Sequence, residues 1–149
     1  TKIFYEDTDI TSSIRNEEIA KVASKLSALS DTRKSLIDIQ RNFMPSNNLV
    51  ADGRDMGTVV FPEAELKIFL VASAEVRAKR RYLELQNRGQ EVNMRDLIAD
   101  IEARDMMDKS RTLSPLIPAE ESIIIDSSTM SLDEVLSFTK KLAKKELNK

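Results

Sequence analysis

Three short apolar runs alternate with amphipathic helical segments along this chain of 149 residues, and this alternation constrains its fold more than any other feature. The runs occupy residues 48–52, 65–73 and 122–126. Strands with nearly continuous apolar side chains are typical of parallel sheets that are buried on both faces. The pattern therefore predicts an α/β fold in which helices flank a parallel sheet.

Apolar residues at helical spacing, together with capping residues, predict the helices. The expected ranges are 17–29, 32–43, 74–88, 94–111 and 132–147. The expected N-caps are Asp31, Ser73, Asn93 and Ser131, the last in a capping box with Glu134. Gly89 suits the position just beyond the third helix. Residues 2–5 are a further strand candidate near the start of the chain.

The chain contains no Cys and no His, which narrows the chemistry that it can perform. Disulfides, thiolate nucleophiles, Ser-His-Asp triads and HExxH zinc sites are excluded. The net charge of −2 gives no general signal for nucleic-acid binding. No apolar run approaches the ~20 residues that a membrane helix needs. The expected compartment is the cytoplasm, and any catalysis must use the remaining polar side chains or the backbone.

Asp52 and Arg54 follow directly after the first apolar run, in the segment LVADGRDMGT. In open parallel sheets, ligands bind beyond the carboxyl ends of the strands. Asp52 there resembles the strand-end carboxylate that helps to hold Mg²⁺ in P-loop enzymes. The Arg54 guanidinium matches the geometry of a phosphate. The alternative interpretation is an Asp-Gly turn with exposed charges, and the local sequence favours neither.

The helix expected at 94–111 carries one stripe that changes from apolar to charged. At ~100° per residue, its members are Met94, Leu97, Ile98, Ile101, Arg104, Asp108 and Arg111. Charged groups on a face that points toward the core must be paired or must face a cleft. An Arg-Asp-Arg array suits a phosphate or a sugar phosphate. The alternative is a helix end that projects past the core, with all three charges solvated.

A basic segment, RAKRR, places Arg77, Arg81 and Arg88 on one helix face with Glu84 between them. Charge runs of this kind usually form a solvated face with Glu–Arg pairs. A second interpretation is a mobile basic helix that closes over a polyphosphate. A nucleic-acid surface is the third, and the two Tyr and the absence of Trp argue against it.

The segments ADGRDMGTVVFP, ELKIFLVAS, RAKRR…LQNRG, ARDMMDKSRTLSPLIPA and DSSTMSLDEV occur in one order. Together they resemble bacterial cytidylate kinase, which moves the γ-phosphate of ATP to CMP or dCMP. The resemblance covers essentially the whole chain and implies an α/β fold like that of P-loop nucleoside monophosphate kinases. It implies one domain, in which residues 1–45 are the remainder of the monophosphate-binding insertion and the helices that follow it. Residues 76–111 are then the lid region, and residues 46–75 and 112–149 are the core.

The resemblance also implies roles for individual residues. Contacts to the cytosine edge are expected from Ser24, Arg33 and Asp55, phosphate contacts from Arg54 and Arg111, and ribose contacts from Arg104 and Asp108. The arginines that act on the reacting phosphates are expected to be Arg54, Arg104 and Arg111. Asp52 is expected near Mg²⁺, and the lid arginines Arg77 and Arg81 near the ATP phosphates.

The sequence departs from the family pattern in two ways. Met106, Met107 and Lys109 stand where family members often have a more Arg-rich run. The GxxxxGK motif of the P-loop is absent, since the three Gly lie at 53, 57 and 89. We therefore expect a longer natural protein, with ~70 or more residues before Thr1. We also expect the 149 residues of this chain to bind ATP poorly and to lack kinase activity on their own. The segments at 48–52 and 66–71 would then lack the strand that the family places between them.

The expected partners are CMP or dCMP and ATP with Mg²⁺, acting on a monomer without nucleic acid or membrane. Three alternatives remain open at this point. They are a kinase for another nucleoside monophosphate, a nucleotide- or nucleic-acid-binding module that uses the RAKRR helix, and a non-catalytic interaction domain.

Overall fold

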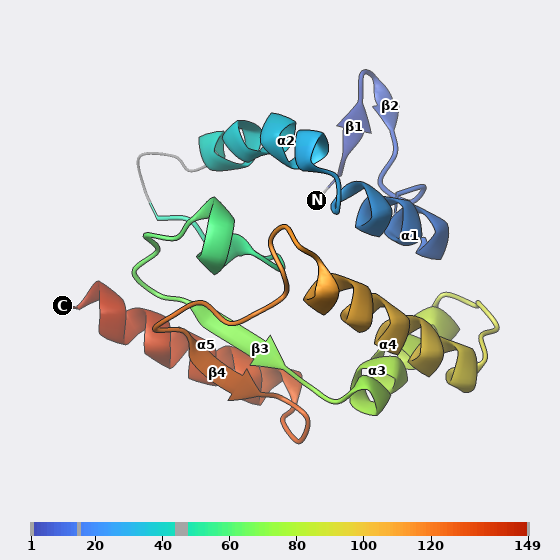
Figure 1. Ribbon diagram of the computed structural model, residues 1–149. Helices are drawn as coiled ribbons and strands as arrows, with labels where there is room; N and C mark the ends of the chain where they lie inside the picture. Colours follow the sequence, from blue (N-terminus) through green and yellow to red (C-terminus); the bar gives the residue numbers. More distant parts are fainter. Residues whose placement is uncertain (1, 15, 44–47, 149) are drawn as a thin grey trace. The chain divides into compact units, whose positions relative to one another are not determined.

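The computed structural model describes residues 2–14, 16–43 and 48–148 (Figure 1). The chain divides into two compact units, Thr1–Asn48 and Leu49–Lys149. The assignment of one domain with an insertion, a lid region and a core stays a prediction. Within the described residues, no helix combines the length and the apolar character needed to cross a bilayer.

The first unit contains a small antiparallel hairpin, formed by β1 (Phe4–Tyr5) and β2 (Thr8–Asp9), and two helices, α1 (Glu17–Leu26) and α2 (Ser30–Asn42). The strand predicted at 2–5 is thus confirmed in its last two residues. The prediction that Asp31 caps the second helix is wrong, because the helix begins at Ser30 after an extended Leu29. Asp31 lies in the first turn instead, where a carboxylate interacts favourably with the helix dipole.

The second unit contains two parallel strands, β3 (Ile68–Val71) and β4 (Ile123–Asp126), and three longer helices. Ile68 pairs with Ile123, and Val71 pairs with Asp126 at the carboxyl end. The helices are α3 (Ala74–Asn87), α4 (Met94–Ser110) and α5 (Leu132–Leu147). Strands, crossover helices and parallel pairing confirm the predicted α/β class.

The strand predicted at 48–52 does not form. Residues 48–52 are irregular, and the Val50 side chain, expected to be buried, is 98% exposed. Among the described residues, β3 pairs only with β4, so this segment has no ladder to join. An apolar sequence alone does not make a strand, since each backbone N–H and C=O needs a partner. The chain next forms a short π-helical turn, η1 (Met56–Val60).

The predicted helix starts in the second unit are confirmed, and α3 and α4 each end one residue before the predicted position. Ser73 accepts a hydrogen bond from the Val76 N–H, and Asn93 accepts one from the Arg95 N–H. Gly89 follows α3 with φ +72°, a left-handed conformation that favours glycine. Local side-chain chemistry therefore determines where these helices begin and end.

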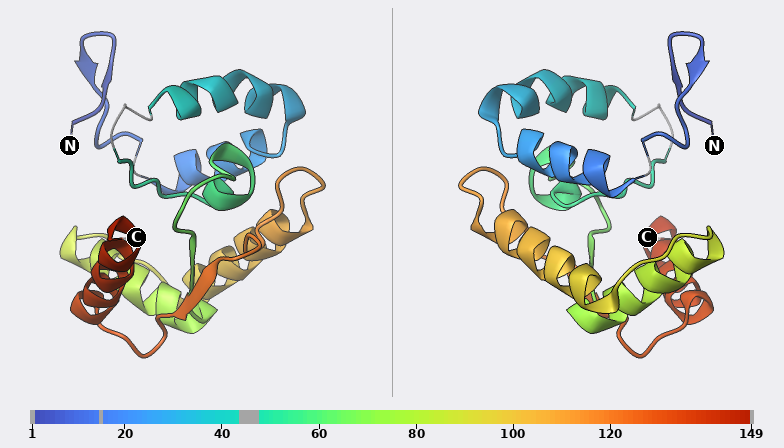
Figure 2. Two further views of the ribbon diagram at one scale, coloured as in Figure 1. Left: turned by 90° about the vertical axis from the view of Figure 1, so that its left-hand side faces the viewer. Right: turned by 90° about the vertical axis from the view of Figure 1, so that its right-hand side faces the viewer.

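Helices α3 and α4 contact each other and meet at an angle in both views of Figure 2. The main apolar cluster of the second unit is buried between them. Ala78 and Leu85 of α3 and Leu97 of α4 are buried there. Partly buried side chains pack around them, namely Tyr82, Val92, Met94, Ile98 and Ile101. The apolar half of the predicted α4 stripe thus does face the core.

Candidate active site

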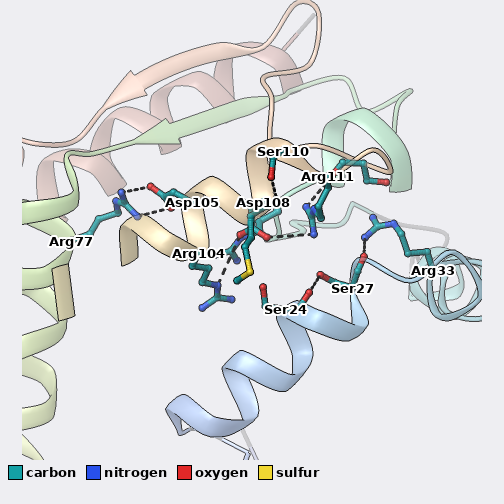
Figure 3. A network of polar contacts seen from close by, with 12 residues as sticks. Ser24, Ser27, Arg33, Arg77, Arg104, Asp105, Asp108, Ser110 and Arg111 are labelled. Carbon is teal, nitrogen blue, oxygen red and sulfur yellow. Dashed lines mark hydrogen bonds and ion pairs between the residues drawn. The ribbon is translucent and has the colours of Figure 1, made fainter. Parts of the chain in front are cut away.

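The charged half of the α4 stripe surrounds a buried carboxylate. The Asp108 side chain is only 2% exposed. Arg54 donates a hydrogen bond from Nε to Asp108 Oδ2. Arg104 Nε lies 4.0 Å from the same oxygen, and Arg111 Nη1 lies 3.5 Å from Oδ1 (Figure 3). The interpretation that these charges are paired is confirmed, and the solvated alternative is wrong.

Helical spacing explains why two of these residues meet, since Arg104 and Asp108 lie about one turn apart on the same face of α4. The helix ends at Ser110, one residue before the predicted end, and Arg111 reaches Asp108 from the non-helical cap position. Arg54 arrives from the irregular segment before η1, 54 positions away in the sequence. The segments ADGRD and ARDMMDKSR, which are separate candidates by sequence alone, therefore both contribute arginines to the cluster around Asp108.

The cluster has more positive than negative charge, because three guanidinium groups approach one carboxylate. The Arg54 and Arg104 side chains are each 39% exposed, whereas that of Arg111 is 8% exposed. Arg54 and Arg104 thus combine an internal carboxylate contact with access for a ligand. Guanidinium groups held in this way can bind an oxyanion through parallel N–H donors.

The loop after α4 holds Arg111 in place. Arg111 Nη2 donates to the Ser114 carbonyl oxygen at 2.9 Å, and the Leu116 N–H donates to the Asp108 carbonyl oxygen at 2.8 Å. Ser114 adopts φ +50°, a left-handed conformation that costs a non-glycine residue about 1 kcal/mol or more. Such strained residues cluster at functional sites, and here the strain accompanies the placement of a guanidinium group.

The two aspartates of the ADGRD segment have different surroundings. Asp55 is buried, and its carbonyl oxygen accepts hydrogen bonds from the N–H groups of Val59 and Val60, the last two residues of η1. Asp52 is exposed and ends the segment that was expected to be a strand. Across the described part of the chain, no three acidic residues gather into a group that could hold a metal ion by themselves.

In the first unit, the structure brings Ser24 and Arg33 to the same helix end. The Ser24 carbonyl oxygen accepts a hydrogen bond from Ser27 Oγ at 2.7 Å, just beyond α1. From α2, Arg33 Nη1 donates to the Ser27 carbonyl oxygen at 2.8 Å (Figure 3). Arg33 thereby satisfies a carbonyl group that the helix end leaves without an intrahelical partner.

The arginines of the RAKRR segment make extensive contacts within the protein. Arg77 forms a two-bond ion pair with Asp105 of α4, at 3.0 and 2.6 Å. Arg81 and Arg88 contact opposite oxygens of Glu84, at 2.8 and 2.5 Å, and the hydrogen bond from Arg81 is the main reason why the pKa of Glu84 is lowered. The Glu–Arg pairing expected for a solvated helix face is confirmed here.

Sequence reasoning did not identify Arg80, Asp105 or Ser127 as important residues. Arg80 donates to the Ser127 hydroxyl at 3.2 Å and to its carbonyl oxygen at 2.6 Å. The buried Ser127 hydroxyl in turn donates to the Val71 carbonyl oxygen at 3.1 Å. This hydrogen bond joins the carboxyl end of β3 to the residue that follows β4. These partners are far apart in the sequence, so no local pattern indicates them.

Known proteins with similar sequences agree with the family resemblance noted from the sequence segments. A family model described as "Cytidylate kinase" matches residues 1–145. The chain is 48% identical over 136 residues to a cytidylate kinase of Pasteurella multocida, and 49% identical over 146 residues to one of Aeromonas hydrophila. It is 52% identical over 134 residues to a cytidylate kinase of Stutzerimonas stutzeri.

These alignments include most of this chain but only part of each relative. They cover 91%, 98% and 90% of the chain, respectively. The corresponding shares of the relatives are 60%, 64% and 58%. The chain therefore spans about 60% of the length of the curated relatives that it matches.

Proposed function

This chain belongs to the cytidylate kinase family, and we propose that the whole protein transfers the γ-phosphoryl group of ATP to CMP or dCMP, giving CDP or dCDP. The observation that carries the proposal is the buried Asp108 carboxylate with Arg54, Arg104 and Arg111 around it. Phosphoryl transfer needs little covalent chemistry from a protein and depends on positioning and on cationic stabilisation. Arginine side chains supply both without the His and Cys that this chain lacks.

On the acceptor side, Arg54 and Arg111 are the proposed ligands of the CMP phosphate. Arg104 and Asp108 are the proposed contacts to the ribose, with the Asp108 carboxylate also orienting the guanidinium groups. Orientation before the substrate arrives is favourable, because no side chain then has to be reorganised during the reaction. Positive charge around the transferred group stabilises its equatorial oxygens in the transition state.

Base recognition is assigned to Ser24, Arg33 and Asp55. These side chains offer a hydroxyl, a guanidinium and a carboxylate, a set that can match the donors and acceptors of cytosine. A base with a different edge would leave some of these groups unpaired, which lowers its transition-state binding. The same argument would apply to another nucleoside monophosphate, so the base preference has to be measured.

On the donor side, Asp52 is the proposed carboxylate for Mg²⁺, and the lid arginine Arg81 is a proposed contact to the ATP phosphates. Mg²⁺ is usually bound through one or two carboxylates plus substrate phosphates, so an exposed single Asp52 fits such a site. When bound, the ion would neutralise charge on the β- and γ-phosphates of ATP.

The first experiment is calorimetric titration of the whole protein with CMP, UMP and AMP. We expect CMP to bind most tightly, and tighter binding of UMP or AMP would instead indicate a kinase for that monophosphate. Binding to RNA that falls steeply with salt, without any effect of CMP on the melting temperature, would favour a nucleic-acid-binding module. The contacts of Arg77, Arg80 and Arg81 within the protein argue against that module.

A matched pair of α4 variants tests the site itself. Arg104→Gln removes a guanidinium beside Asp108, and we expect the KM for CMP to rise by about tenfold or more. Lys109→Gln removes an exposed positive charge from the same helix and should leave the KM nearly unchanged. If a coupled kinase assay shows the same change in the KM for CMP for both variants, Arg104 has no specific role in binding CMP.

A further inference from the structure

We propose that Arg77 and Asp105 form a positioning pair, which sets the orientation of α4 and thereby aims Arg104 and Asp108 at the acceptor substrate. The proposal rests on the function proposed above and adds two residues to it. Neither residue touches the Asp108 cluster directly in the contacts described, so their effect passes through the helix that carries the cluster.

The contacts of Arg77 are those of a tether. Its Nη1 and Nη2 donate to the two carboxylate oxygens of Asp105, at 3.0 and 2.6 Å (Figure 3). Its Nε donates to the Ala72 carbonyl oxygen at 3.0 Å. Ala72 directly follows β3. One guanidinium group therefore joins the carboxyl end of a strand, the first turn of α3 and the C-terminal half of α4.

The C-terminal half of α4 needs such a tether. The N-terminal half is held by apolar packing, since Leu97 is buried against Ala78 and Leu85 of α3. Beyond that cluster, Met106 and Met107 are exposed, and polar contacts of Asp105 and Asp108 attach this part of the helix to other segments. Ion pairs with two parallel hydrogen bonds add directional precision that a single contact lacks.

Helix geometry links the pair to the site. Asp105 is the residue after Arg104 and stands three positions before Asp108, about 60° from it around the helix axis. A rotation of α4 that breaks the Arg77–Asp105 pair therefore also turns Arg104 and Asp108. A displacement of about 1 Å in a positioning element can lower catalysis by up to a hundredfold.

A positioning role differs in its kinetics from the role that the family resemblance implies for Arg77. A direct ligand of the ATP phosphates would affect the KM for ATP when it is replaced, and its partner Asp105 would not. A positioning pair would affect the acceptor side, and both partners would give the same result.

The test uses steady-state kinetics of the whole protein with CMP and ATP varied separately. The variants are Arg77→Gln, Asp105→Asn and their double mutant, with Glu102→Gln as a matched control on an exposed position of α4. We expect each single variant to lower kcat/KM for CMP by about tenfold, mainly through KM, with the KM for ATP unchanged. The double mutant should be no worse than the single variants, because both remove the same interaction.

Three results would overturn the positioning role. They are a raised KM for ATP in Arg77→Gln alone, additive effects in the double mutant, and a lower melting temperature with kcat/KM unchanged. If Arg77→Gln does not fold, Arg77→Lys takes its place, since it keeps the charge and loses the two-bond geometry.

Wild-type protein without CMP binding or turnover would contradict the proposed function itself. The positioning role is then read from NMR chemical shifts of the Arg104 and Asp108 side chains. These shifts should change in Asp105→Asn and stay constant in Glu102→Gln, and constant shifts in both variants would refute the pair.

Discussion

At the scale of single residues, Asp108 shows how a buried charge depends on its partners. A carboxylate that is 2% exposed is stable only when positive charge and hydrogen bonds compensate for lost hydration. Arg54, Arg104 and Arg111 provide that compensation. The same arrangement leaves two of the guanidinium groups accessible, so stability of the site and its capacity to bind an anion have a common origin.

Asp108→Asn is expected to lower the free energy of unfolding by about 3 kcal/mol. The substitution keeps the side-chain shape but removes the negative charge that three arginines approach, and breaking a buried ion pair typically costs about 3–5 kcal/mol. Equilibrium urea unfolding measures the change, with Glu102→Gln as an exposed carboxylate control on the same helix. A loss below about 0.5 kcal/mol is typical of a surface substitution, and it would show that the ion pairs of Asp108 do not stabilise the fold.

At the scale of elements, the capping box of α5 makes the start of that helix sensitive to acid. Hydrogen bonds from the Ser131 backbone N–H, and then from its hydroxyl, lower the pKa of Glu134 from its ordinary value of 4.5. A carboxyl group with a lowered pKa in the folded state stabilises that state above its unfolded pKa. The contribution is lost as the pH falls through the folded pKa.

Hydrogen exchange tests this acid sensitivity. Between about pH 6 and about pH 3, protection of the α5 amides from Val135 onward should fall as Glu134 becomes protonated. Glu134→Gln is the matched variant, because Gln can serve in a capping box but does not titrate. An equal loss of protection in wild type and variant would show that Glu134 is not responsible.

At the scale of the whole molecule, the two units differ in how much they bury. In the described part of the first unit, at residues 2–14, 16–43 and 48, no residue with an assigned burial is buried. Apolar side chains such as Val22, Ile39 and Phe43 are exposed there. The second unit buries Ala78, Leu85 and Leu97 between two helices and Ile125 in its sheet. Burial of apolar surface is the main favourable term in folding, so the units should differ in local stability.

Amide exchange at neutral pH is expected to be at least about tenfold faster in α1 and α2 than in α3 and α4. Mass spectrometry of peptic fragments resolves the four helices. Peptides from α5 are the internal comparison for the effect of burial. This helix belongs to the second unit and has a capping box, but none of its residues whose burial is described is buried. Equal protection in all four helices would contradict the expected difference.

Much of the element map follows from local sequence. Ser73, Asn93 and Gly89 mark real helix boundaries, because capping involves residues only a few positions apart. The α4 stripe predicted which charges would share a face for the same reason. The errors concern non-local requirements: the apolar residues 48–52 found no neighbouring strand, and Leu29 rather than Asp31 precedes the second helix.

The sequence by itself determined the α/β class, the helix boundaries of the second unit to within one residue, and the charged residues that gather at the C-terminal end of α4. Periodicity and capping depend on neighbours within one or two helical turns, so they can be read from the chain directly. The tertiary structure decided that Arg54 meets Asp108 across 54 positions and that Arg77 meets Asp105 across 28. Such pairs depend on how distant segments are brought together, and a basic run such as RAKRR looks the same whether its arginines face solvent, a ligand or an aspartate on the next helix.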